Sequence, residues 1–306
     1  MEGETARSSE ANEPEGPGSS GGRLPSPRAA RHSPRNLRPS TSIAPLSRAA
    51  VGALVALVVV LAARRTRSLA PSGALAALLL GTAACAAGWE WAALLILFFV
   101  AGTTLSRIGG AAKRARTASV VEKGDERDAA QVLANGGAFG AAAIASLVAP
   151  GEPMLAFGAG ALAAAAADTF ATEIGTLVGG TPRSLLTRRP VTLGMSGGVT
   201  WAGSGASLVG AALIALAARA LGWSAPAAWA SLAGGVAGSL VDSLLGAALQ
   251  ARRRCPHCDL PTERVIHDCA TPTRPDGGVA WIGNDAVNLA STVSGGLLAA
   301  LFSRLV

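Results

Sequence analysis

Two carboxylates, Asp168 and Glu173, stand inside a stretch that is otherwise almost entirely apolar, AAAAADTFATEIGTLVGG (residues 163–180). On a helix, which advances about 100° per residue, these acids share one face with the threonines of the stretch. A charged carboxylate in apolar surroundings is unfavourable unless it is paired, hydrated or bound to a metal. Because the acids lie about 7.5 Å apart along the axis, they would flank a Mg²⁺–phosphate group rather than chelate one ion. The alternative is structural: acids that pair with Arg from nearby loops.

Further oxygen ligands occur in two later apolar stretches. Asp242 follows the G-x-x-x-G pattern of Gly234 and Gly238, which lets helices approach closely, so its side chain must point into the bundle or a cavity. Asp285 with Asn288 three residues on could present oxygens to Mg²⁺. Asn284 and Asp285 also suit the N-cap and the positive end of a helix, which is the purely structural reading.

Groups that could hold phosphate lie in two basic segments. In RRPVTLGMSGGVTWAGSGAS (residues 188–207), Arg188 and Arg189 run into backbone amides and hydroxyls that suit a polyphosphate. No G-K-[ST] follows, so this is not a Walker motif, and glycine-mediated helix packing is the alternative. Arg127 stands just before a polar helix face made of Asp128, Gln131 and Asn135. It would bind phosphate, or would only set topology or contact anionic lipid.

A polar segment carries cysteines and histidines at spacings typical of metal ligands. Cys255, Cys258, His267 and Cys269 could close a tetrahedral zinc site, with His257 as a competing ligand. The alternatives are a redox-active pair of cysteines or thiols without a special role. No Ser-His-Asp arrangement is visible, which gives hydrolysis by a histidine base little support.

These residues must be positioned by membrane-spanning helices. Half of the 306 residues are hydrophobic and only 15% are charged, whereas about a quarter are charged in soluble domains. A soluble alanine-rich helical protein would show polar outer faces, and these stretches are apolar all round. We predict an all-α polytopic transmembrane helix bundle of about seven or eight spans. The apolar stretches are 43–63, 69–87, 89–108, 132–149, 154–178, 199–221, 225–249 and 286–302.

The predicted organisation is a disordered Pro/Ser/Arg-rich tail over residues 1–47 and an integral membrane domain over 48–306, with a polar Cys/His-containing cytoplasmic loop at 250–283. The acids of the tail argue against a transit peptide. The net charge of +7 lies in alternate loops rather than on one soluble surface, so we expect no nucleic-acid partner. By the positive-inside rule these loops are cytoplasmic. The basic tail conflicts with this if 43–63 spans fully, and the sequence leaves that choice open. We expect a multi-pass protein of the cell membrane, in contact with membrane lipids.

Five ordered blocks, EKGDERDAAQVLANGG, ADTFATEIG, RRPVTLGMSGGVT, GSLVDSLLGAALQ and WIGNDAVN, resemble the domain of unknown function 92 family of integral membrane proteins. That family includes transmembrane protein 19 and the chloroplast phytyl-phosphate kinase. The resemblance covers about residues 70–303. When the resemblance is followed block by block, several residues of this sequence fall at positions typical of the family. They are Asp168, Thr169, Glu173, the Gly-Ser-Thr loop, Asp242, Ser243, Asn284, Asp285 and Asn288.

The resemblance and the residues together favour a prenyl-phosphate kinase that transfers a phosphoryl group from CTP or ATP, with Mg²⁺, to a prenyl monophosphate at the cytoplasmic side. In this hypothesis the carboxylates bind Mg²⁺ or orient the acceptor: Asp168, Glu173, Asp242 and Asp285. The phosphates and nucleotide contact Arg127, Arg188, Arg189, Ser196, Gly197, Gly198 and Asn288. The alternatives are a transporter whose intramembrane carboxylates are ion-coupling sites, and a membrane scaffold.

Overall fold

The computed structural model describes residues 45–122, 124 and 126–305. The predicted disordered tail, residues 1–47, therefore lies almost wholly outside the described residues. The first helix already begins at Pro45, so the membrane domain starts slightly earlier than the predicted boundary at residue 48.

Helices dominate the described residues, and the prediction of an all-α transmembrane bundle is confirmed. Seven of the helices are long and apolar enough to cross a membrane, and an eighth, α2, is apolar but has 17 residues. The helices are α1 (Pro45–Arg65), α2 (Pro71–Ala87), α3 (Trp89–Arg107), α4 (Gly110–Thr117), α5 (Ala129–Val148), α6 (Glu152–Val178), α7 (Trp201–Ala220), α8 (Ala225–Ala248) and α9 (Asn284–Phe302).

Polar side chains fix where the spans begin. Asp128 accepts from the backbone N–H of Gln131, whose side chain accepts in return from the N–H of Asp128, forming a capping box at the start of α5. Thr200 and Ser224 accept from the third following backbone N–H and cap α7 and α8. The predicted N-cap role of Asn284 is wrong, because Gly283 occupies that position and Asn284 is the first residue of α9.

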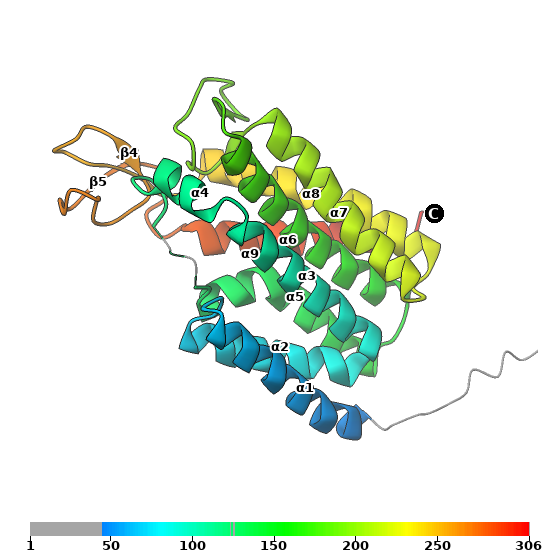
Figure 1. Cartoon of the computed structure of the whole chain (residues 1–306). Coiled ribbons are helices and arrows are strands. Elements are labelled where there is room, and N and C mark those ends of the chain that lie inside the picture. Colours follow the sequence, from blue (N-terminus) through cyan, green and yellow to red (C-terminus); the bar gives the residue numbers. More distant parts are fainter. Residues whose placement is uncertain (1–44, 123, 125, 306) are drawn as a thin grey trace, which may run out of the picture. The chain divides into compact units, whose positions relative to one another are not determined.

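The helix α6 lies at the centre, packed against α3, α5, α7, α8 and α9, while α1 and α2 lie along one side (Figure 1). Residues 156 and 158–167 of α6 are all buried, and they are Ala, Gly and one Leu. Small side chains let neighbouring backbones approach closely. With 27 residues, α6 is about 40 Å long, some 10 Å longer than a hydrocarbon core. Its last turns, which carry Glu173 and Thr176, can therefore lie at the level of the headgroups.

The basic connections between the helices meet at one end of the bundle, which we call the basic end. The backbone N–H of Arg127 donates to Ser68 O, and Arg107 donates to Thr66 O. The connection after α4 is in turn held by Arg264, whose guanidinium donates to Ala118 O. The described residues of the connections at this end are 66–70, 108–122, 124, 126–128, 179–200 and 249–283.

The polar Cys/His-containing segment at 250–283 has strands of its own. It contains an antiparallel three-stranded sheet in the order β4-β3-β5. Its strands are β3 (Arg252–Arg254), β4 (Pro261–Thr262) and β5 (Arg274–Gly277), while β1 (Arg183–Ser184) and β2 (Gly198–Val199) form a separate hairpin before α7. We call residues 250–283 the Cys/His lobe. Figure 1 shows β4 and β5 of this lobe beside α4.

Candidate functional site

The most unusual polar feature inside the bundle is a pair of carboxyl groups. The side chains of Asp168 on α6 and Asp242 on α8 lie close enough to interact electrostatically. Oδ2 of Asp242 is buried and has no hydrogen-bond partner among the described residues. Two carboxylates this close repel each other unless a proton or a cation lies between them. The pair is therefore a candidate cation site.

Small residues bring the two acids together. A Cβ on Gly238, one turn before Asp242, would come within 2.6 Å of Ala164 Cβ, and a Cβ on Gly235 within 2.7 Å of Ala163 Cβ. The α8 backbone therefore touches α6 directly along the seam that leads to the acids. Hydroxyl groups also lie along this seam. Ser207 and Ser239 form a hydrogen bond with each other at 3.1 Å, and Ser291 Oγ donates to Gly238 O at 2.9 Å.

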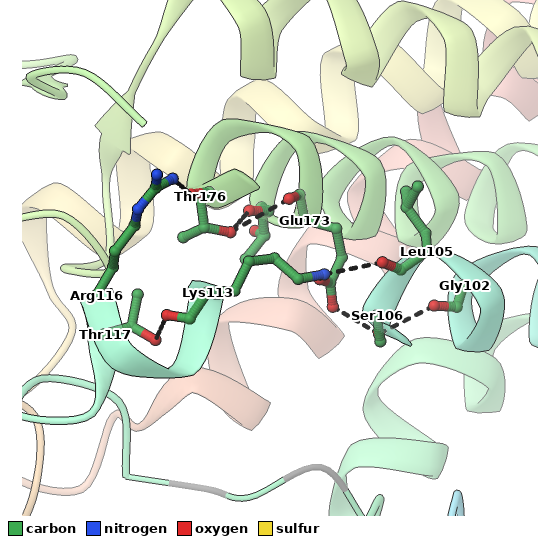
Figure 2. Close-up of polar contacts among 9 residues, drawn as sticks. Gly102, Leu105, Ser106, Lys113, Arg116, Thr117, Glu173 and Thr176 are labelled. Atoms are coloured by element: carbon green, nitrogen blue, oxygen red, sulfur yellow. Dashed lines mark hydrogen bonds and ion pairs between the residues drawn. The ribbon is translucent and has the colours of Figure 1, made fainter. Parts of the chain in front are cut away.

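Glu173 lies on the polar face of α6, at the border opposite Asp168, and has its own partners. Its Oε2 is ion-paired with Lys113 of α4, and its Oε1 accepts from Ser106 Oγ at 2.5 Å. Lys113 also donates to Leu105 O at 2.8 Å, and Figure 2 shows this network between α3, α4 and α6. The side chains of Lys113 and Glu173 are 8% and 21% exposed. The structure thus gives Glu173 the structural partner that the sequence left as an alternative to Mg²⁺.

Among the described residues, no third Asp, Glu, His or Cys joins Asp168 and Asp242 in a compact group. The four carboxylates that the sequence singled out therefore do not form one centre. Asp285 lies in the first turn of α9, and Asn288 is buried one turn further in, on a helix that packs against α5, α6 and α8.

An apolar cavity of about 110 Å³ lies between α1, α2, α3 and α5. Most of its wall consists of Val, Leu, Ile, Ala and Phe side chains, and its polar groups are Arg127, Gln131, Asn135 and Thr169. The Arg127 guanidinium also donates to Thr103 Oγ1 at 3.3 Å and lies 5.9 Å from the centroid of the Phe99 ring. An apolar cavity with a cation and amides on its wall suits a ligand with a hydrocarbon chain and an anionic head.

The Gly-Ser segment predicted to contact nucleotide packs against α8 near the acid pair. A Cβ on Gly246, one turn after Asp242, would lie 2.9 Å from Gly197 N and 3.2 Å from Ser196 Cβ. The backbone N–H of Ser196 donates to Glu263 Oε1 at 2.8 Å. Arg188 and Arg189 are exposed on the loop between β1 and β2, and no contact of their side chains with Ser196 is seen in the described part of the chain.

Four side chains of the Cys/His lobe converge. The ligand atoms of Cys255, Cys258, His267 and Cys269 all lie within 4.8 Å of one another, and His257 is not in this group. A hydrogen bond with the Thr271 hydroxyl, at 3.2 Å, and one with His267, at 3.3 Å, lower the pKa of Cys269 to about 5. Cys269 is thereby disposed to be a thiolate, the form that binds metals.

Comparison with known proteins identifies the family to which the chain belongs. The family described as "Integral membrane protein DUF92" matches residues 54–296. The chain belongs to the DUF92 family of integral membrane proteins. Protein PGR of Arabidopsis thaliana is 28% identical over 265 residues, which cover 78% of this chain and 90% of that protein. Uncharacterized membrane protein MJ0933 of Methanocaldococcus jannaschii is 29% identical over 259 residues, which cover 84% of this chain and 94% of that protein. No solved structure matches.

Sequence reasoning missed two residues of this DUF92 protein's basic end. Lys113 is the ion-pair partner of Glu173, and Glu263 holds the Ser196 amide. Each lies in a polar segment where nothing marks it out from neighbouring charges. A usable signal for Lys113 was present, because a short basic stretch after the third span would pair with any acid near the end of a neighbouring span.

Proposed function

We propose that this DUF92 protein transfers a phosphoryl group from a nucleoside triphosphate to a lipid monophosphate of the prenyl type. The observation that carries the proposal is the apolar cavity with Arg127 on its wall. An engineered apolar cavity of roughly 150 Å³ holds benzene, so this space fits about one isoprenoid unit, and the rest of the chain would remain in lipid. The Arg127 guanidinium would then meet the phosphate head in a charge-assisted hydrogen bond.

Asp168 and Asp242 supply the second requirement. The carboxylate pair fits a Mg²⁺ ion, because it offers oxygen ligands only and Asp242 Oδ2 has no hydrogen-bond partner in the described part of the chain. Mg²⁺ bound there would neutralise charge on the phosphates. The Ser196–Gly198 segment, packed one turn from Asp242, would line the nucleotide there, and Glu263 would hold this segment in place through the Ser196 N–H.

The reaction needs positioning rather than covalent catalysis by the protein. An oxygen of the lipid monophosphate attacks the γ-phosphorus, the bond from this phosphorus to the β,γ-bridging oxygen breaks, and the nucleoside diphosphate leaves. The product is a lipid diphosphate. The basic end, where Arg127 and the Ser196 segment lie, would face the cytoplasm by the positive-inside rule, on the side that holds CTP and ATP.

The test is phosphoryl transfer by the full chain purified in detergent. Labelled CTP or ATP is supplied with Mg²⁺ and a panel of prenyl monophosphates, and the labelled lipid diphosphate is measured. We expect product from the wild type and its loss in Asp168→Asn and Asp242→Asn. Glu152→Gln is the matched control, since Glu152 is a carboxylate at the opposite end of α6 that accepts a hydrogen bond from Ser224. A folded wild type that forms no product from any pair would overturn the proposal.

The buried acid pair also favours a second candidate, a transporter. Carboxylates at membrane depth without a basic partner are typical of coupling-ion sites, and neither Asp168 nor Asp242 has an ion-pair partner among the described residues. Reconstituted vesicles distinguish the two. A transporter would move a proton or cation across the bilayer in an Asp168-dependent way with no nucleotide present, whereas the kinase would not.

A further inference from the structure

The Cys/His lobe has the geometry of a closed metal site. Zinc–sulfur bonds of about 2.3 Å give S···S edges of about 3.8 Å in a tetrahedron. The Sγ atoms of Cys255 and Cys269 are 3.5 Å apart, and His267 Nδ1 is 3.3 Å from Cys269 Sγ. The four ligand atoms all lie within 4.8 Å of one another, so small side-chain movements would bring them to the distances of a zinc site.

Two further observations point to a metal. His267 is 5% exposed, and its Nε2 is buried with no hydrogen-bond partner among the described residues. Since Nδ1 is the ring nitrogen that faces Cys269 Sγ, a metal bound by His267 would take Nδ1, and burial of the ring holds that nitrogen towards the cysteines. The backbone N–H of Cys258 also points at Cys255 Sγ, at 3.5 Å. A hydrogen bond of this kind orients a sulfur that serves as a metal ligand.

Three consecutive residues, Thr262 at the end of β4 and the two that follow it, join the lobe to the other connections of the basic end. Thr262 Oγ1 donates to Ser119 O at 2.7 Å, and Arg264 Nη1 donates to Ala118 O at 2.7 Å. Between them, Glu263 accepts from the Ser196 N–H at 2.8 Å and from Gln250 Nε2 at 3.0 Å. The lobe therefore fastens the connection after α4 to the Ser196 segment.

We propose that Cys255, Cys258, His267 and Cys269 bind a structural Zn²⁺, and that this ion holds the Cys/His lobe in the shape that lets Glu263 fix the Ser196 segment. The two ligand pairs come from separate turns, one between β3 and β4 and the other between β4 and β5. The metal is what joins these turns across the sheet. With so few sheet residues and little apolar core of its own, the lobe depends on the ion for its fold. The inference needs neither kinase nor transport activity.

The first experiment measures zinc in the full chain, purified in detergent after expression with zinc, by elemental analysis. We expect about one Zn²⁺ per chain in the wild type and in His257→Ala, whose histidine is exposed and is not one of the four converging ligands, although its Nδ1 lies 3.6 Å from Cys258 Sγ. Cys255→Ser and His267→Ala should lose it. Replacement by Co²⁺ should give the visible absorption of a tetrahedral thiolate site. A wild type without zinc, or one with Cys255 and Cys269 joined in a disulfide, would overturn the site.

The second experiment measures deuterium uptake of peptides that contain Ser196. Chelation of the zinc, or His267→Ala, should raise the exchange rate there several-fold, while His257→Ala should not. Glu263→Ala should raise it equally with zinc still bound, because it removes the acceptor alone. If zinc leaves and the Ser196 peptides exchange as before, the metal does not act through Glu263 and the second half of the proposal is wrong.

Discussion

Gly238→Ala tests the seam that brings Asp242 to Asp168. The added Cβ would lie 2.6 Å from Ala164 Cβ, 2.9 Å from Ser291 O and 3.2 Å from Gly295 Cα. Carbon atoms prefer separations of about 3.5–4.0 Å, so α8 must move by about 1 Å. The obstructing atoms belong to two different helices, α6 and α9, and two of them are backbone atoms. No side-chain rotation can therefore relieve the clash.

Overpacking of this kind costs about 1–3 kcal/mol. Gly205→Ala on α7 is the matched control, because no described residue outside its own stretch of helix lies within 4 Å of the position of its added Cβ. Both substitutions gain the same helix propensity, about 1 kcal/mol, so this contribution cancels between them. We expect Gly238→Ala to be less stable than Gly205→Ala by about 1–3 kcal/mol.

The assay is reversible unfolding in mixed detergent and SDS micelles, followed by tryptophan fluorescence and by helicity. The difference between the two variants is read at the same micelle composition. Equal stability of the two variants would refute the reasoning, since it would mean that α8 does not lie against α6 and α9 as closely as the structure places it. The contact between the two aspartates would then also lose its structural basis.

Three further outcomes are expected. Lys113→Met should destabilise the fold by about 2–3 kcal/mol, because it removes the ion-pair partner of Glu173. The double variant with Glu173→Gln should recover most of the lost stability. A double-mutant cycle that shows no coupling energy between the two residues would contradict this prediction. Burial raises the pKa of Glu263 above its ordinary 4.5, so the folded state binds more protons there than the unfolded state. The free energy of unfolding should therefore fall as pH rises above about 4.5. Measured across this pH range, the free energy of unfolding should change less in Glu263→Gln than in the wild type. Arg127→Ala should raise KM for the lipid monophosphate about 10- to 100-fold, as expected for the loss of a charged hydrogen bond, and should leave KM for the nucleotide unchanged. A raised KM for the nucleotide with an unchanged KM for the lipid would instead place Arg127 at the nucleotide.

The spans could be predicted because lipid imposes a simple rule, namely some 20 apolar residues per helix. The predicted segment 225–249 agrees with α8 to within one residue. The start of α5 was predicted at residue 132, three residues late, because Gln131 is polar and directly precedes the apolar stretch. In the structure Gln131 belongs to the capping box and lies inside the helix.

The partners of the acids could not be read from the sequence. Lys113 and Glu173 are 60 residues apart, and Glu263 is 67 residues from Ser196. Contacts over such distances depend on how the helices pack, which hydropathy does not report. The helical wheel placed Asp168 and Glu173 at the two borders of one polar face, but only the packing of α8 and α4 shows that the two acids have different neighbours.

The most direct test of the central claim is electron paramagnetic resonance of Mn²⁺, used in place of Mg²⁺, with the full chain, nucleotide and a prenyl monophosphate. The account predicts one bound Mn²⁺ with hyperfine coupling to phosphorus in the wild type and in Glu152→Gln, and loss of this signal in Asp168→Asn and Asp242→Asn. Mn²⁺ that binds with the same affinity in those two variants, or that shows no coupling to phosphorus, would contradict the assignment of the Asp168–Asp242 pair as the site where metal and phosphate meet.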